Sequence, residues 1–90
     1  MSLPPDVVRA LDRFAPGERD VARRLLDEVL AATQANEGAR VVRCVVWLGR
    51  DFAELERYAA AARTDYRDVI WWAEYEGGET RLRDFSAPLP

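Results

Sequence analysis

The clearest structural signal in the sequence is an apolar stripe that recurs with the period of an α-helix. Charged residues fill the positions between its members, which is typical of a helix with one face turned toward a core. We expect this helix to run from Pro16 to Asn36, about 30 Å at a rise of ~1.5 Å per residue, and Gly38 to end it. The members of the stripe are Val21, Ala22, Leu25, Leu26, Val29 and Leu30.

Capping residues predict three further helices. Prolines at the first turn favour a short helix from about Pro4 to Phe14. Asp51 begins an Asp-x-x-Glu capping box, followed by apolar positions at helical spacing. Asp65 is placed to cap a final helix, and Gly77-Gly78 to end it. The inward face of this final helix is expected to consist of Tyr66, Val69, Ile70 and Ala73.

The segment from Arg40 to Leu48 fits either a helix or a strand. Its four valines favour a strand, whereas helical spacing separates its polar residues from an apolar face. Gly49 and Asp51 favour the helix, because a glycine that ends one helix and an aspartate that begins the next make a compact turn. The polar face of that helix would hold Arg40, Arg43, Trp47 and Arg50, opposite Val41, Cys44, Val45 and Leu48.

Together these elements predict a mainly α fold. Residues 1–90 are expected to form a single domain, a compact bundle of four to five short helices with an extended C-terminal tail over residues 79–90. An α+β fold is the alternative, in which residues 41–48 form a strand and residues 69–75 and 80–85 pair as a hairpin. The residues suited to anchor the tail are Leu82, Phe85 and Leu89.

The composition excludes several classes of function. The chain has 90 residues and a formal charge of −3, from 13 arginines against 16 acidic residues, and it contains neither histidine nor lysine. The commonest general base, the commonest metal ligand and the lysine of Schiff-base or P-loop chemistry are therefore absent. We expect a protein that is not an enzyme and that holds no metal and no cofactor.

The single cysteine and the N-terminal residues bear on location. Cys44 has no partner within the chain for a disulfide, which fits a reducing compartment. Residues 1–14 lack the apolar core of a signal peptide, and no apolar run approaches the ~20 residues that cross a bilayer. The sequence predicts a cytoplasmic protein without a membrane partner.

The motif Asp65-Tyr66-Arg67-Asp68-Val69, with apolar positions on both sides, resembles a family of short uncharacterised bacterial proteins. Their shared pattern is an apolar segment ending in Leu, a Gly-Asp turn, a helix, and then Asp-(Tyr/Trp)-Arg-Asp-(Val/Leu). The resemblance covers about residues 40–75, and the sequence departs from the pattern at Gly49-Arg50-Asp51, where an arginine is inserted. It implies a bacterial origin and helices on both sides of that turn. It implies no activity, because the family has none assigned.

The same motif is the densest polar cluster in the chain. In a functional interpretation Arg67 holds an anion in a pocket beside Tyr66, and Asp65 or Asp68 orients the guanidinium. In a structural interpretation Asp65 caps the final helix, Asp68 complements its dipole, and Arg67 pairs locally. The sequence favours the structural interpretation, because a cap already accounts for both acids.

Three aromatic residues are expected on the outer flank of the final helix. Helical geometry places Trp71, Trp72 and Tyr75 away from its inward face. Either the tail covers these rings with Phe85 or Leu89, or they contact a partner or a second copy of the chain. Few residues remain to cover three large rings within the chain.

Basic and acidic clusters give weaker signals. Arg40, Arg43, Arg50 and Trp47 suggest weak nucleic-acid binding, with Arg43 stacked on the ring of Trp47. The local charge between residues 40 and 67, from six arginines and four acids, is only +2, so a nucleic-acid partner is disfavoured. Near the C-terminus, a solvated acidic turn is favoured over a cation site for Glu74, Glu76 and Glu79.

The sequence thus predicts a small cytoplasmic bacterial protein that binds a protein partner or forms a homodimer. The expected interaction residues are Trp71, Trp72, Tyr75 and Trp47. A ligand pocket at Arg67, Asp65 and Asp68 and weak nucleic-acid binding are the alternatives.

Overall fold

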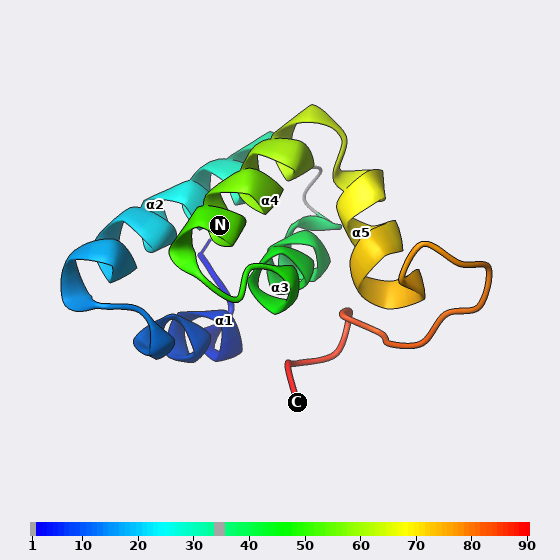
Figure 1. Ribbon diagram of the computed structural model, residues 1–90, viewed down its shortest axis with the longest axis horizontal. Coiled ribbons are helices and arrows are strands. Elements are labelled where there is room, and N and C mark those ends of the chain that lie inside the picture. The colour runs from blue at the N-terminus through cyan, green and yellow to red at the C-terminus, as the bar shows by residue number, and fades with distance from the viewer. Residues whose placement is uncertain (1, 34–35) are drawn as a thin grey trace.

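Helices separated by short turns make up most of the chain. The computed structural model describes residues 2–33 and 36–90, and within these ranges it contains helices and no strand (Figure 1). The prediction of a mainly α bundle is confirmed, and the segments that the α+β alternative assigned to strands are helical or irregular. The elements are α1 Pro5–Ala10, the 3₁₀ turn η1 Leu11–Arg13, α2 Pro16–Ala32, α3 Gly38–Leu48, α4 Phe52–Thr64 and α5 Tyr66–Tyr75.

The predicted caps of α4 and α5 are confirmed. The carboxylate of Asp51 accepts a hydrogen bond from the backbone N–H of Glu54 at 2.8 Å, and that of Asp65 accepts one from the backbone N–H of Arg67 at 3.1 Å. At the other end of α5, Glu76 and Gly77 take left-handed conformations with φ of 49° and 77°. The left-handed residue that ends α5 is thus Glu76, and Gly77 continues the reversal in a conformation that glycine adopts without strain.

One predicted helix end was wrong, and near another the helix changes type. α1 stops at Ala10 and continues as a 3₁₀ turn, and α2 stops at Ala32 rather than Asn36. The hydroxyl of Thr33 donates to the carbonyl of Val29 at 2.7 Å, and its backbone is extended. Gly38 begins α3 instead of ending α2; a Cβ there would lie 2.6 Å from Cδ1 of Leu30, so glycine permits close packing of the two helices. The predicted continuation through residues 34–35 lies outside the described residues.

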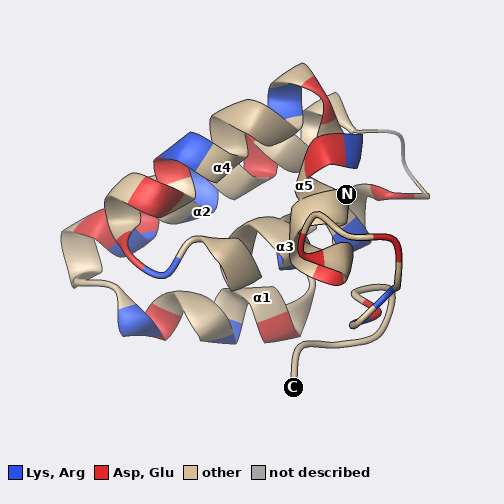
Figure 2. Cartoon of the chain, turned by 45° about the vertical axis from the view of Figure 1, so that its right-hand side comes forward, with Lys and Arg blue, Asp and Glu red and all other residues tan. Residues whose placement is uncertain are grey.

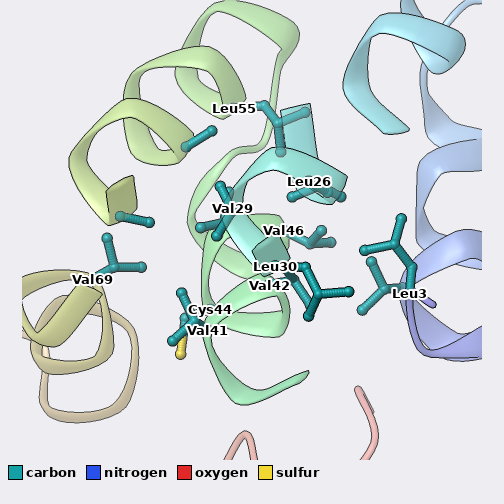
Figure 3. Packing of buried hydrophobic residues seen from close by; sticks show 14 of the residues in the cluster. Leu3, Leu26, Val29, Leu30, Val41, Val42, Cys44, Val46, Leu55 and Val69 are labelled. Carbon is teal, nitrogen blue, oxygen red and sulfur yellow. The ribbon is translucent and has the colours of Figure 1, made fainter. Parts of the chain in front are cut away.

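The central element is α3, which packs against each of the other four α-helices. Six consecutive residues, 41–46, are buried, so this helix is enclosed on all sides. Its predicted polar face is therefore not a solvent face, because Arg43 is buried as well. Figure 3 shows Val29 of α2 and Val69 of α5 beside the buried side chains of α3. In Figure 2, α2 and α4 carry both acidic and basic positions, whereas α3 is mostly uncharged. The described residues form one compact body with a radius of gyration of 11.8 Å.

Gly49 allows the chain to turn from α3 into α4 at close range. A Cβ at this position would lie 2.7 Å from Cα of Leu55, a backbone atom that cannot move aside. We expect Gly49→Ala to lower the free energy of unfolding by about 2 kcal/mol, because the two helices must separate. Urea unfolding measures this, with Gly17→Ala as the control, since a Cβ at Gly17 has no neighbour within 4 Å. An equal decrease in the free energy of unfolding in both variants would contradict the explanation that a Cβ at Gly49 collides with Leu55.

The C-terminal residues 76–90 form neither helix nor strand and return across the molecule from the end of α5 toward α1 (Figure 1). The backbone N–H of Leu82 donates to the carbonyl of Glu74 at 2.6 Å, and the ring of Phe85 is buried against the core. None of the helices in the described ranges combines the length and apolarity needed to cross a bilayer.

Candidate functional site

Aromatic rings gather on the outer side of α5, where the sequence placed them. Trp71 is 47% exposed and Trp72 is 37% exposed, and Tyr75 is half-buried. On the other side of the helix, Val69 and Ala73 are fully buried and hold α5 against the core. We call Trp71, Trp72 and Tyr75, together with Tyr58 of α4, the aromatic surface.

A hollow opens within this surface, between α4 and α5. It has a volume of about 310 Å³ and is lined by Arg57, Tyr58, Ala61 and Trp72. The rings of Tyr58 and Trp72 meet edge to face at 6.0 Å, and the guanidinium of Arg57 lies 4.8 Å from the centre of the Tyr58 ring. Apolar walls with a cation at the edge suit an apolar or aromatic side chain.

The turn after α5 positions Trp71 without covering it. Its indole N–H donates to the carbonyl of Gly78 at 2.9 Å. This satisfies the polar end of the indole and fixes its orientation, while nearly half of the side chain stays in contact with solvent. The alternative in which Phe85 or Leu89 of the tail covers these rings is wrong, because Phe85 lies against Trp47 and Leu89 lies beside Asp6.

Phe85 packs on Trp47 instead, with ring centres 5.5 Å apart. The guanidinium of Arg83 lies 5.0 Å from the same indole ring. The prediction that Arg43 stacks on Trp47 is wrong, because Arg43 binds Asp6 and a residue of the tail takes its place. Trp47 thus contacts the chain's own tail and is not part of the aromatic surface.

The Asp65, Arg67 and Asp68 cluster lies at the start of α5. Both carboxylate oxygens of Asp65 accept from the guanidinium of Arg67, at 3.0 and 3.1 Å. These hydrogen bonds, with that from the backbone N–H of Arg67, keep the pKa of Asp65 below its ordinary value. The side chain of Arg67 is 78% exposed, and the three hollows of about 490, 390 and 310 Å³ are lined by other residues. The geometry agrees with the capping interpretation.

Glu74 contradicts its predicted place in a solvated acidic turn. Its side chain is completely buried, and its carboxylate accepts from Arg40 at 2.6 and 2.9 Å, from Arg81 at 3.0 Å and from the backbone N–H of Phe85 at 3.0 Å. Burial favours the protonated acid, but the hydrogen bonds from Arg40 and Phe85 outweigh it and hold the pKa of Glu74 below its ordinary value. Glu76 pairs with Arg83.

A second buried ion pair joins the two ends of the described chain. Asp6 accepts from the guanidinium of Arg43 at 2.9 and 3.3 Å, and from the backbone N–H of Leu89 at 3.0 Å. Arg43 also donates to the carbonyls of Phe85 and Ser86, each at 3.2 Å. We call the contacts of Glu74 and those of Asp6 together the tail clamp. Its charged members are Asp6, Arg40, Arg43, Glu74 and Arg81.

Sequence reasoning missed the tail clamp because its partners are far apart in the chain. Arg40 and Glu74 are separated by 34 residues, and Asp6 and Arg43 by 37. The available signal was the position of two arginines in a helix otherwise made of apolar residues, since such a buried charge requires a buried partner. Arg40 and Arg43 are two of the three arginines in the predicted nucleic-acid surface. In the tail clamp their guanidinium groups bind carboxylates of the same chain.

The metal-ligating residue types and Cys44 are the remaining candidate groups. Within the described ranges, no three residues of the metal-ligating types lie close enough to share an ion. Cys44 is buried, and desolvation, together with the charge of Glu74, raises the pKa of its thiol. The thiolate form that acts as a nucleophile is correspondingly disfavoured.

Comparison of the chain with protein-family models, with curated proteins and with solved structures found no match. The resemblance of the Asp65–Val69 motif to a bacterial family therefore stays a prediction.

Proposed function

We propose that this protein is a protein-binding module whose aromatic surface contacts a second copy of the chain. The observation that carries the proposal is the exposure of two neighbouring indoles, 47% for Trp71 and 37% for Trp72, in a small domain that buries most of its other large apolar side chains. Aromatic residues are enriched at the centres of protein interfaces, where each buries a large area at low entropic cost.

The shape of the aromatic surface supports a second copy as the partner. The surface combines rings that project from α5 with a hollow of about 310 Å³ beside Trp72. A two-fold contact brings the same surface of both copies together, so a ring of each copy can fill the hollow of the other. A small chain also gains stability from the apolar area that dimerisation buries.

Charges beside the rings support the same arrangement. Arg57 lies at the edge of the hollow on α4, and Asp68 is exposed on α5, one helical turn before Trp72. Because the two charges are opposite and belong to the same surface, a two-fold contact can pair Arg57 of each copy with Asp68 of the other. We place this association in the cytoplasm, since Cys44 is a free thiol.

Sedimentation velocity of the purified chain over about a hundredfold range of concentration tests the proposal by mass action. We expect the weight-average sedimentation coefficient to rise from that of a monomer to that of a dimer. The concentration at which half of the chains are dimeric should rise as salt is added, because salt screens the attraction between Arg57 of one copy and Asp68 of the other. A chain that stays monomeric throughout this range would contradict self-association.

A further inference from the structure

A larger groove lies away from the aromatic surface, between the N-terminal helix and the end of α3. Its volume is about 490 Å³, and three arginines line it: Arg9 of α1, Arg13 of η1 and Arg50 after α3. Trp47 and Leu89 contribute to its walls. We call it the arginine groove.

The three guanidinium groups differ in whether they already bind other parts of the chain. Arg13 donates through one nitrogen to the carbonyls of Val46 and Gly49 at 2.5 and 2.6 Å, which fixes its guanidinium against the end of α3. Within the described part of the chain, the side chains of Arg9 and Arg50 take part in no ion pair or hydrogen bond, and both residues are exposed. The groove therefore contains one positioned cation and two uncommitted ones.

The acid in the groove does not neutralise these cations. Asp6 lies in the lining, but both of its oxygens already accept hydrogen bonds from Arg43, and one accepts from the backbone N–H of Leu89 as well. The side chains of the lining thus bring three positive charges to one cavity, whose wall also includes Pro90. The formal charge of the whole chain is −3. An electropositive hollow in an acidic protein concentrates anions at that place.

We propose that the arginine groove binds a small ligand that carries a diphosphate group. The planar guanidinium fork matches phosphate oxygens, and arginines on both sides of the groove suit a ligand with two adjacent phosphoryl groups better than a single phosphate. The volume lies in the range of small-ligand pockets. A longer polyanion is disfavoured, because Asp12 and Asp51, which are next to Arg13 and Arg50 in the sequence, are exposed outside the lining of the groove.

Isothermal titration with inorganic pyrophosphate at low ionic strength tests this site. We expect saturable 1:1 binding that weakens about tenfold in Arg9→Gln and in Arg50→Gln, since each variant loses charged hydrogen bonds to the anion. Arg24→Gln is the matched control: Arg24 is exposed on α2, outside the groove, and the substitution removes the same charge. This control should change the affinity by less than about twofold.

Absence of saturable binding to the unmodified chain would overturn the proposal, and so would an equal loss of affinity in the Arg24→Gln control. A single-stranded oligonucleotide serves as the second probe and is expected to compete no better than pyrophosphate. Much tighter binding of the oligonucleotide would assign the surface to nucleic acid and overturn the small-ligand site. The result is independent of self-association, because the arginine groove and the aromatic surface share no residue.

Discussion

Replacing Glu74 by glutamine is expected to lower the free energy of unfolding by about 3 kcal/mol at neutral pH. The side chain is completely buried, and glutamine keeps its shape but removes the charge that pairs with Arg40 and Arg81. Those two arginines would then face a neutral amide whose NH₂ group competes with them as a donor. Such a loss is a large fraction of the stability of a small domain.

Urea unfolding at pH 7 measures this effect, and Glu76→Gln provides the matched control two residues away. Glu76 also pairs with an arginine, Arg83, but its side chain is 55% exposed. An exposed ion pair contributes little, so the control should lose less than about 1 kcal/mol. Equal losses in the two variants would show that burial of Glu74 is not what makes its ion pair important.

The same ion pairs make stability depend on pH. The pKa values of Glu74 and Asp6 are lower in the folded chain than their ordinary values, so the unfolded chain binds protons first as the pH falls. Their contribution is complete above the unfolded values of about 4.3 and 3.9 and is lost progressively below them. The difference between the unmodified chain and Glu74→Gln should therefore shrink between pH 7 and pH 3. A difference that stays constant over this range would contradict the lowered pKa of Glu74.

Replacing Trp71 and Trp72 together by alanine is expected to raise the dissociation constant of self-association at least about thirtyfold. Both indoles are exposed in the single chain and are buried by the proposed contact. The core beneath them, Val69 and Ala73, is untouched, so the far-ultraviolet circular dichroism of the variant should keep its helical signal. Sedimentation of the two forms at equal concentration gives the comparison.

Val21→Ala is the control for this variant, because Val21 is an apolar residue on α2 with the same 37% exposure as Trp72. It should leave the dissociation constant nearly unchanged. Unfolding of the double tryptophan variant would mean that the indoles belong to the core. An unchanged dissociation constant of the double variant would show that the aromatic surface does not form the contact between the two copies.

Much of the fold follows from local sequence signals. The apolar stripe of α2 and the capping aspartates Asp51 and Asp65 act on neighbouring residues, and the structure confirms the elements that they predict. The exposure of Trp71 and Trp72 also followed from helical spacing, because their angular position on α5 is fixed once Val69 and Ala73 face inward.

What the sequence did not predict depends on contacts between distant segments. Glu74 lies in a run of acids near two glycines, which is typical of a solvated turn, and only the return of the tail encloses it. The arginine groove likewise joins Arg9 and Arg13 to Arg50, which is more than thirty residues away in the sequence. Local patterns carry no information on such pairings, since the path of the chain decides which charges meet.

The most direct test follows each indole separately during association. Fluorine NMR of the chain labelled with fluorotryptophan gives one signal for each of its three tryptophans, assigned through single Trp→Phe variants. As concentration rises, the signals of Trp71 and Trp72 should shift, while that of Trp47, packed on Phe85 and Arg83, should stay in place. Signals of Trp71 and Trp72 that do not change while the chain dimerises would show that the contact is made elsewhere.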